Sequence, residues 1–237
     1  MGRVTGKSII VTGAGSGIGE GFARIFGAEG AKVGVCDLNP DAAMRVASFI
    51  NDNGGQAIAL TADVSQRAQV AAAFKKFVDW AGSLDVLFNN AGFNKPMPLM
   101  EVTEENWNAI MNVNGLGTLI GVQEGGKYMI KQKSGKIINT ASIAGRQGYP
   151  SFTPYCASKF AVNAITQATA RALAQYNINP IDSGPFAYSS LQKDSQGNIL
   201  SYVLVAIRWN RRSRRQLAYR DARLPLVPHP ASSLPPP

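Results

Sequence analysis

The chain has 237 residues, 45% of them hydrophobic, which is enough to bury the core of a single α/β domain. It contains no run of 18 apolar residues and does not begin with the apolar stretch of a secretory signal, so we expect a soluble, cytoplasmic protein that does not enter membranes. The net charge is +9, of which residues 1–180 contribute +4 (16 basic against 12 acidic) and residues 181–237 contribute +5 (8 against 3), so the basicity is concentrated near the C-terminus.

Apolar stretches of strand length alternate with longer segments of helical period along the first 176 residues. Strands are predicted at residues 8–12, 32–37, 57–61, 86–89 and 136–142. Helical segments are predicted at residues 17–30, 40–53, 65–80, 103–132 and 153–176. Several of these strands lack the alternation of apolar and polar residues, as is typical of sheets buried on both faces. The order predicts an α/β fold with a parallel sheet and crossover helices.

The pattern ends near Ile178. Residues 179–237 are basic and rich in proline, with seven of the 13 prolines after position 181 and a cluster of arginines at 208–215. We therefore divide the chain into a domain at 1–178 and a divergent segment at 179–237, and expect this segment to be disordered rather than packed. The arginine cluster could be a nucleic-acid arm, but it lacks aromatic platforms, so we expect no nucleic-acid partner.

Two cysteines, Cys36 and Cys156, lie within predicted regular structure. They are too few for a disulfide framework or a metal site, so we expect buried free thiols and no metal.

A glycine-rich loop, Thr-Gly-Ala-Gly-Ser-Gly-Ile-Gly at residues 12–19, joins the first strand to the first helix. Such a junction lets a backbone approach a pyrophosphate, whose charge is met by free amides at the helix N-terminus. The glycines Gly13, Gly17 and Gly19 do not follow the general G-x-G-x-x-G spacing, so an ordinary tight turn remains an alternative.

Asp37 follows the second strand about 20 residues beyond this loop, where a ribose-binding acid is expected. Its carboxylate would accept hydrogen bonds from the adenosine ribose hydroxyls and repel a 2′-phosphate, which favours NAD over NADP. Ser16 supports this, because NADP-binding loops often carry a basic residue there. Alternatively, Asp37 only opens the next turn together with Asn39 and Pro40.

Later motifs resemble those of the short-chain dehydrogenase/reductase family, over about residues 7–178. Besides the loop at 12–19, they are Asp63-Val64, Asn-Asn-Ala-Gly at 89–92, Asn114 within 113–117, Ser142 within 137–142, and Tyr-Cys-Ala-Ser-Lys at 155–159. Ser142 precedes Tyr155 by 13 residues, as the family pattern requires. Each motif alone could be an ordinary surface or turn element, but their order and spacing together favour the functional interpretation.

The resemblance implies a Rossmann-like doubly wound parallel sheet with helices on both faces and incomplete C-terminal strands. It implies catalytic roles for Asn114, Ser142, Tyr155 and Lys159. Tyr155 would exchange the substrate proton, Ser142 would donate to the substrate oxygen, and Asn114 would hold a water that links Lys159 to solvent. Because Lys159 follows Tyr155 by four residues on one helix face, its charge is expected to lower the pKa of the phenol.

The expected cofactor-binding residues belong to the loops that follow the strands. They are Gly13, Ser16, Gly17, Ile18, Gly19, Asp37, Leu38, Asp63, Val64, Asn90, Ala91 and Gly92, with Tyr155 and Lys159. Asn89 is expected to brace the central strand instead.

The expected reaction is hydride transfer between NAD(H) and a small secondary alcohol or polyol, or the corresponding ketone. One alternative is an NADP-dependent 3-oxoacyl reductase, and another is a cofactor-binding protein whose aberrant C-terminus impairs catalysis. The resemblance also implies a homodimer or homotetramer, paired through the fourth and fifth helical segments.

The family's sixth strand ends in Pro-Gly, whereas this sequence has Gly184-Pro185 and a proline, Pro180, within the corresponding stretch. Proline removes a donor from the ladder, so a central strand there is doubtful. Genuine divergence or an altered reading frame after codon 178 would explain the change. We hypothesise the second, because the change is abrupt; the hypothesis fails if neither other frame of the coding DNA continues the family pattern.

Overall fold

The computed structural model describes residues 2–182, 192–193 and 199–201. The expectations for the arginines at 208–215 and for the proline-rich end lie outside the described residues.

Six strands form a parallel sheet in the order β3-β2-β1-β4-β5-β6. Their bounds are β1 Ser8–Thr12, β2 Lys32–Asp37, β3 Gln56–Thr61, β4 Val86–Asn89, β5 Gly135–Asn139 and β6 Ile178–Asp182. The chain moves outward from β1 to β3 and returns to the other side of β1 with β4, which creates a topological switch point between β1 and β4. Ligands of open α/β sheets bind outside the carboxyl ends of the strands at such a point.

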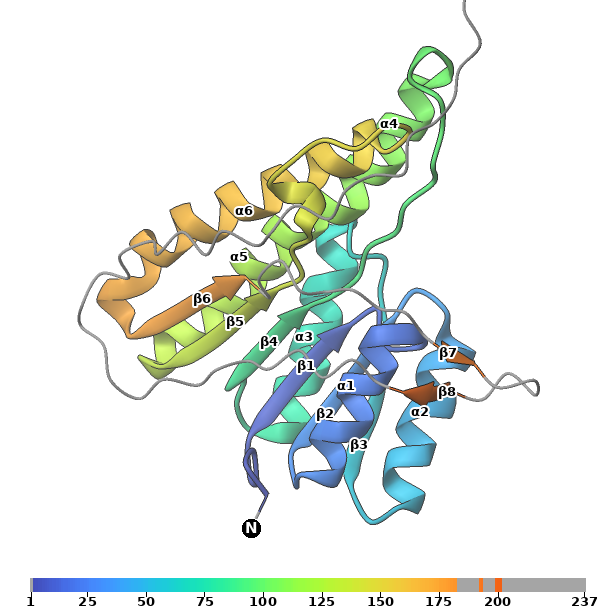
Figure 1. Ribbon diagram of the computed structural model, residues 1–237. Coiled ribbons are helices and arrows are strands. Elements are labelled where there is room, and N and C mark those ends of the chain that lie inside the picture. Colours follow the sequence, from blue (N-terminus) through green and yellow to red (C-terminus); the bar gives the residue numbers. More distant parts are fainter. Residues whose placement is uncertain (1, 183–191, 194–198, 202–237) are drawn as a thin grey trace, which may run out of the picture. The chain divides into compact units, whose positions relative to one another are not determined.

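Helices cover both faces of this sheet (Figure 1). They are α1 Gly17–Ala28, α2 Pro40–Asp52, α3 Arg67–Ala81, α4 Glu104–Ile110, α5 Gly117–Gln132 and α6 Thr153–Leu173, with short turns at Leu99–Glu101, Ile143–Gly145 and Ala174–Tyr176. The doubly wound α/β fold predicted from the sequence is confirmed.

Alternate residues of β1 enter two separate cores, because successive side chains of a strand point to opposite faces. Ile9 and Val11 pack with the buried residues of α1 and α2, whereas Ile10 packs with those of α3 and α5. Every residue of β1 is buried, which accounts for the apolar run from Ile9 to Val11 between Ser8 and Thr12.

The sixth strand corrects the doubt raised by Pro180. Residues Ile178–Asp182 pair in parallel with β5, and Pro180 lies opposite Ile137. Among the described residues β6 ends the sheet order, and proline is found in sheets chiefly on edge strands, where one side of the strand makes no ladder. The sheet therefore extends four residues past the boundary at 178.

Several other predicted helix and strand ends differ from the structure by one to three residues, and two of these differences affect the site. The predicted strand 136–142 ends at Asn139, so Ser142 lies beyond the strand and caps the turn Ile143–Gly145. The predicted helix 103–132 is interrupted by a π-helical turn, Met111–Leu116, between α4 and α5. A two-stranded antiparallel sheet, β7 Gln192–Lys193 with β8 Ile199–Ser201, was not predicted.

Cys36 and Cys156 are both buried free cysteines, as predicted. Burial raises the pKa of the Cys36 thiol to about 12, with a smaller contribution from the charge of Asp37, so this thiol stays protonated. Within the described ranges, no helix has the length and apolar character needed to cross a membrane.

Candidate active site

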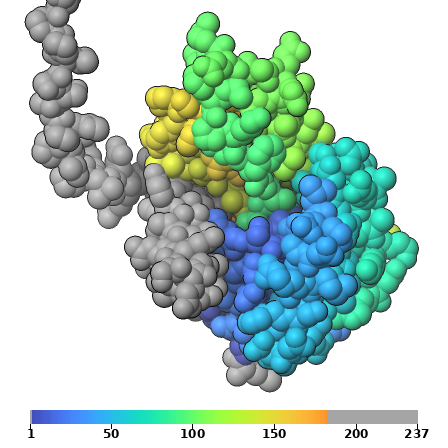
Figure 2. Space-filling view, turned by 90° about the vertical axis from the view of Figure 1, so that its right-hand side faces the viewer, coloured from blue at the N-terminus to red at the C-terminus, as the bar shows by residue number. Residues whose placement is uncertain are grey.

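The predicted site residues gather at the carboxyl ends of the strands. The glycine loop follows β1, Asp37 ends β2, Asn90 follows β4, and Ser142 lies three residues beyond β5. Tyr155 and Lys159 occupy the first two turns of α6. Figure 2 shows the dark blue N-terminal segments adjoining the green and yellow segments of the middle of the chain along one seam.

The backbone of the glycine loop has a conformation that would let a ligand approach it closely. Gly13 and Gly17 have φ values of 63° and 56°, in the left-handed region that favours glycine. A Cβ on Gly19 would lie 2.1 Å from the carbonyl oxygen of Gly13. The Ser16 side chain makes no cap hydrogen bond to α1, so it leaves the first amides of that helix open to an anion.

Thr12 joins the glycine loop to the Asn-Asn-Ala-Gly segment, a role that the sequence did not reveal. Its Oγ1 accepts from the backbone N–H of Asn90 at 3.0 Å and of Ala91 at 3.1 Å. The Asn90 side chain also bonds to the glycine loop: its Nδ2 donates to the carbonyls of Thr12 at 3.0 Å and Gly13 at 3.2 Å. Asn90 therefore braces the loop in addition to its predicted place beside a cofactor.

Asp37 contacts the glycine loop directly. Its Oδ2 accepts from the backbone N–H of Gly15 at 2.8 Å, and its Oδ1 accepts from that of Asn39 at 3.0 Å. A carboxylate has about four acceptor positions, so two remain for ribose hydroxyls. The alternative that Asp37 opens a turn is also partly correct, because the bond to Asn39 forms that turn.

The other predicted cofactor residues lie in α1 and just after β2 and β3. Leu38 is exposed next to Asp37, and Ile18 is partly buried in the first turn of α1. Asp63 follows β3, and its Oδ1 accepts from the N–H and hydroxyl of Ser65, which leaves its other oxygen for a ligand. Val64 packs against α5, since a Cβ on Gly117 would lie 2.8 Å from its Cγ2.

Ser142 and Tyr155, the residues predicted to handle the substrate proton, share a side-chain hydrogen bond. Ser142 Oγ accepts from the N–H of Ala144 at 3.2 Å, which leaves its hydroxyl proton free to be donated. Burial raises the pKa of Tyr155, and a side-chain hydrogen bond with Ser142 opposes that rise without cancelling it.

The raised pKa of Tyr155 contradicts the prediction that the charge of Lys159 lowers it. The Lys159 amine donates to the carbonyl of Thr140 at 2.7 Å and lies 5.6 Å from the centroid of the Tyr155 ring. Burial also lowers the pKa of Lys159 itself to about 8. An amine with a pKa of about 8 has lost its proton before a phenol of raised pKa ionises, so it does not offset the desolvation of the phenol, and the pKa of Tyr155 is raised rather than lowered.

Asn114 lies in the π-helical turn, a kind of bulge that is frequent at functional sites. Its Nδ2 donates to the carbonyl of Phe93 and to Ser158 Oγ, both at 3.0 Å, and its Oδ1 accepts from the N–H of Phe93 at 3.0 Å. A Cβ on Gly92 would lie 3.0 Å from Asn114 Oδ1 and 3.7 Å from Lys159 Nζ. The structure therefore brings Asn114, Gly92 and Lys159 together; the water-holding role of Asn114 stays a prediction.

A buried polar chain supports the strands beneath the site. Asn89 Nδ2 donates to Asn139 Oδ1 at 2.9 Å, and Asn139 Nδ2 donates to Thr166 Oγ1 at 2.9 Å. These bonds link β4 and β5 to α6, so Asn89 braces the central strands as predicted.

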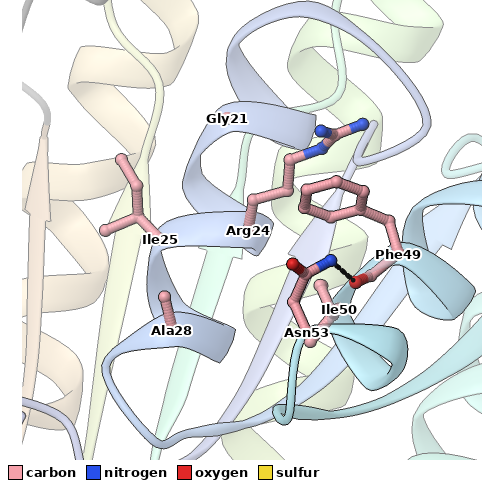
Figure 3. Close-up of a pocket in the computed structure, with 7 residues that line it drawn as sticks. All are labelled: Gly21, Arg24, Ile25, Ala28, Phe49, Ile50 and Asn53. Carbon is pink, nitrogen blue, oxygen red and sulfur yellow. Dashed lines mark hydrogen bonds between the residues drawn. The ribbon is translucent and has the colours of Figure 1, made fainter.

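A separate hollow of about 350 Å³ lies between α1 and α2, lined by Gly21, Arg24, Ile25, Ala28, Phe49, Ile50 and Asn53 (Figure 3). Its lining includes none of the predicted site residues, and Arg24 is its one charged side chain. We therefore place the active site at the strand ends and not in this hollow.

The glycine cradle, the open helix N-terminus and the carboxylate at the end of β2 fit a dinucleotide, and Ser142, Tyr155 and Lys159 lie at the neighbouring strand ends. The fold and site thus define a nicotinamide-dinucleotide-binding oxidoreductase. The family model for short chain dehydrogenases matches residues 7–197. The chain belongs to the short-chain dehydrogenase family.

Curated relatives of different substrate classes align with most of the chain. It is 37% identical over 173 residues to a diacetyl reductase [(S)-acetoin forming] of Staphylococcus epidermidis, covering 73% of this chain and 67% of the relative. It is 38% identical over 178 residues to a sorbitol dehydrogenase of Cereibacter sphaeroides, covering 75% and 68%. It is 36% identical over 176 residues to a 3-oxoacyl-[acyl-carrier-protein] reductase of Thermotoga maritima, covering 74% and 72%.

Two solved structures share the fold. An NAD⁺-bound xylitol dehydrogenase superposes with a TM-score of 0.73 at 32% identity, covering 76% of this chain and 70% of that one. A gluconate 5-dehydrogenase from Burkholderia cenocepacia J2315, in complex with NADP and tartrate, has a TM-score of 0.73 at 34% identity, covering 76% and 71%.

Proposed function

We propose that this chain transfers a hydride between NAD(H) and a small secondary alcohol or polyol, or the corresponding ketone. The observation that carries the cofactor assignment is the Asp37 carboxylate, held against the glycine loop by its bond to Gly15. At this position a carboxylate binds two ribose hydroxyls and repels a 2′-phosphate. The similarity to sorbitol and xylitol dehydrogenases supports the polyol class.

A bound nicotinamide would supply or accept the hydride. Gly13, Gly17 and Gly19 would hold the pyrophosphate close to the backbone, and Asp37 would hold the ribose. In the oxidation direction, Tyr155 Oη takes the proton of the substrate hydroxyl, and the Ser142 hydroxyl donates to the same substrate oxygen.

Protonation of Lys159 would assist the proton transfer. Its pKa of about 8 lets the amine change charge near neutral pH. When protonated, the Lys159 amine would favour the phenolate of Tyr155 through its positive charge.

Cofactor choice is tested by titrating NADH and NADPH fluorescence with the purified chain and with an Asp37→Asn variant. We expect NADH to bind more tightly to the unchanged protein, and the preference to decrease in Asp37→Asn because a repulsive charge is removed. Tighter binding of NADPH to the unchanged protein would contradict the proposal.

The reaction is tested with a panel of polyols, diols and secondary alcohols, following NAD⁺ reduction. A Tyr155→Phe variant, which keeps the ring and removes the hydroxyl, should still bind NADH but lose turnover. If the unchanged protein binds NADH but oxidises nothing in the panel, the alternative of a cofactor-binding protein with impaired catalysis is favoured.

A second candidate is an NADP-dependent 3-oxoacyl reductase, which the similarity to the Thermotoga maritima reductase favours. Asp37 and the uncharged Ser16 argue against it, because neither would pair with a 2′-phosphate. Faster reduction of a 3-oxoacyl thioester with NADPH than of any small ketone with NADH would establish this alternative.

We further propose that the chain forms a homodimer or homotetramer through α4, α5 and α6. The exposed apolar side chains of Trp107 on α4, Phe160 on α6 and Leu116 in the turn between α4 and α5 support this. Sedimentation equilibrium should show a dimer or larger species, and Phe160→Glu should shift it toward the monomer.

A further inference from the structure

Three charged side chains of α1 and α2 form a cluster next to the glycine loop. Glu20 lies at the start of α1 and accepts from Arg45 of α2 through both oxygens, at 2.9 Å from Nη1 and 2.8 Å from Nη2. Arg24, one turn further along α1, also donates to Glu20. One carboxylate thus pairs with two guanidinium groups.

Arg45 also contacts the loop itself. Its Nη2 donates to the carbonyl oxygen of Gly15 at 2.7 Å, while the N–H of the same glycine donates to Asp37 Oδ2 at 2.8 Å. A Cβ on Gly15 would lie 2.8 Å from both Asp37 Cγ and Ala42 Cβ. Gly15 is therefore held on one side by Arg45 and on the other by Asp37.

Glu20 is positioned to hold Arg45 in this place. Arg24 lies 3.7 Å over the ring of Phe49, a cation–π contact that anchors it beside the α1–α2 hollow (Figure 3). The Glu20 side chain is only 13% exposed. Burial alone would raise the pKa of Glu20, but the bond to Arg45 and the charges of both arginines lower it overall, so the carboxylate stays ionised at neutral pH.

We propose that Arg45 is a positioning residue that fixes the glycine loop and Asp37 for the cofactor, and that Glu20 restrains Arg45 in this role and away from a 2′-phosphate. The second part rests on the proposed function, in which Asp37 receives the adenosine ribose. Because Arg45 and Asp37 contact the same glycine, the guanidinium lies near the carboxylate that would hold the ribose. Guanidinium groups bind phosphates well when they are free to do so.

The test uses three variants of the full-length chain and one matched control. Arg45→Gln removes the contact with Gly15, Arg45→Lys keeps the charge, and Glu20→Gln releases Arg45. The control, Arg3→Gln, breaks an exposed arginine–glutamate pair with Glu29, at 3.3 Å, at the far end of α1. Dissociation constants for NADH and NADPH are measured by fluorescence, and folding is checked by circular dichroism and thermal unfolding.

We expect Arg45→Gln to raise the Kd for NADH about three- to tenfold, as the loss of a partly exposed charged contact does. Arg45→Lys should recover part of the loss, and kcat at saturating NAD⁺ should stay unchanged, so that the effect appears in KM. Glu20→Gln should shift the ratio of NADPH to NADH affinity toward NADPH. If Arg45 and Glu20 had only structural roles, Arg45→Gln and Glu20→Gln would lower the unfolding temperature and leave the ratio of NADPH to NADH affinity unchanged.

Hydrogen exchange of the loop amides in the cofactor-free protein gives a readout that is independent of the proposed function. Exchange at residues 13–19 should be faster in Arg45→Gln than in the unchanged protein and in Arg3→Gln. Unchanged exchange, or an unchanged Kd for NADH, would overturn the role of Arg45, and an unchanged affinity ratio in Glu20→Gln would overturn that of Glu20. If the unchanged protein binds neither nucleotide, the proposed function and the role of Glu20 fail, while the exchange measurement still decides the role of Arg45 in the loop.

Discussion

Replacing Lys159 with methionine is expected to stabilise the cofactor-free protein at neutral pH. The Lys159 side chain is almost fully buried, and burial lowers its pKa from 10.5 to about 8. Each tenfold loss of proton affinity corresponds to about 1.4 kcal/mol, so holding the charged amine in the folded state costs about 3 kcal/mol. Losing the bond to the Thr140 carbonyl offsets about 1 kcal/mol of this, which leaves a gain of about 2 kcal/mol in the free energy of unfolding.

The pH dependence of this gain follows from the two pKa values. Below pH 8 the amine is protonated in both the folded and the unfolded protein, and the folded state carries the whole penalty. Between pH 8 and 10.5 the unfolded state binds more protons, so the unchanged protein gains stability as the pH rises. The advantage of Lys159→Met should therefore be largest at pH 7 and mostly gone by pH 10.

Urea unfolding followed by circular dichroism at both pH values measures this difference. Lys76→Met is the matched control, because the Lys76 amine also donates to a backbone carbonyl, that of Ala59 at 3.3 Å, but is exposed. We expect little change in the control at either pH. A Lys159→Met variant that is less stable than the unchanged protein at pH 7, or whose advantage persists at pH 10, would refute the reasoning.

Two further predictions concern the loop and the buried polar chain. Gly19→Ala should abolish NADH binding in titrations while the circular dichroism spectrum is retained, because its Cβ would lie 2.1 Å from the Gly13 carbonyl oxygen; normal binding would show that the loop can shift. Asn139→Leu should lower the free energy of unfolding by about 2 kcal/mol or more, because it leaves the buried side chains of Asn89 and Thr166 without their partner. In urea unfolding, a loss below about 0.5 kcal/mol would contradict the assigned bracing role.

Local patterns in the sequence were sufficient for most of the sheet. The predicted bounds of β1, β2 and β4 agree with the structure residue by residue, because the interior of a strand buried on both faces lacks the alternating polar residues of a half-exposed strand. The end of β5 was wrong because residues 140–142 continue the sequence pattern after the backbone pairing with β4 has stopped at Asn139. The strand at Pro180 was doubted because its place at the end of the sheet order is a property of the topology.

The sequence by itself determined the loop glycines, the acid after β2 and the four-residue spacing of Tyr155 and Lys159. These features depend on residue type and on separations of a few residues, which local patterns record. Only the tertiary structure decided that the Lys159 amine faces Thr140, that burial raises the pKa of Tyr155, and that Arg45 reaches the Gly15 carbonyl. Those outcomes depend on desolvation and on contacts between residues as many as 30 positions apart, and neither leaves a periodic signal in the chain.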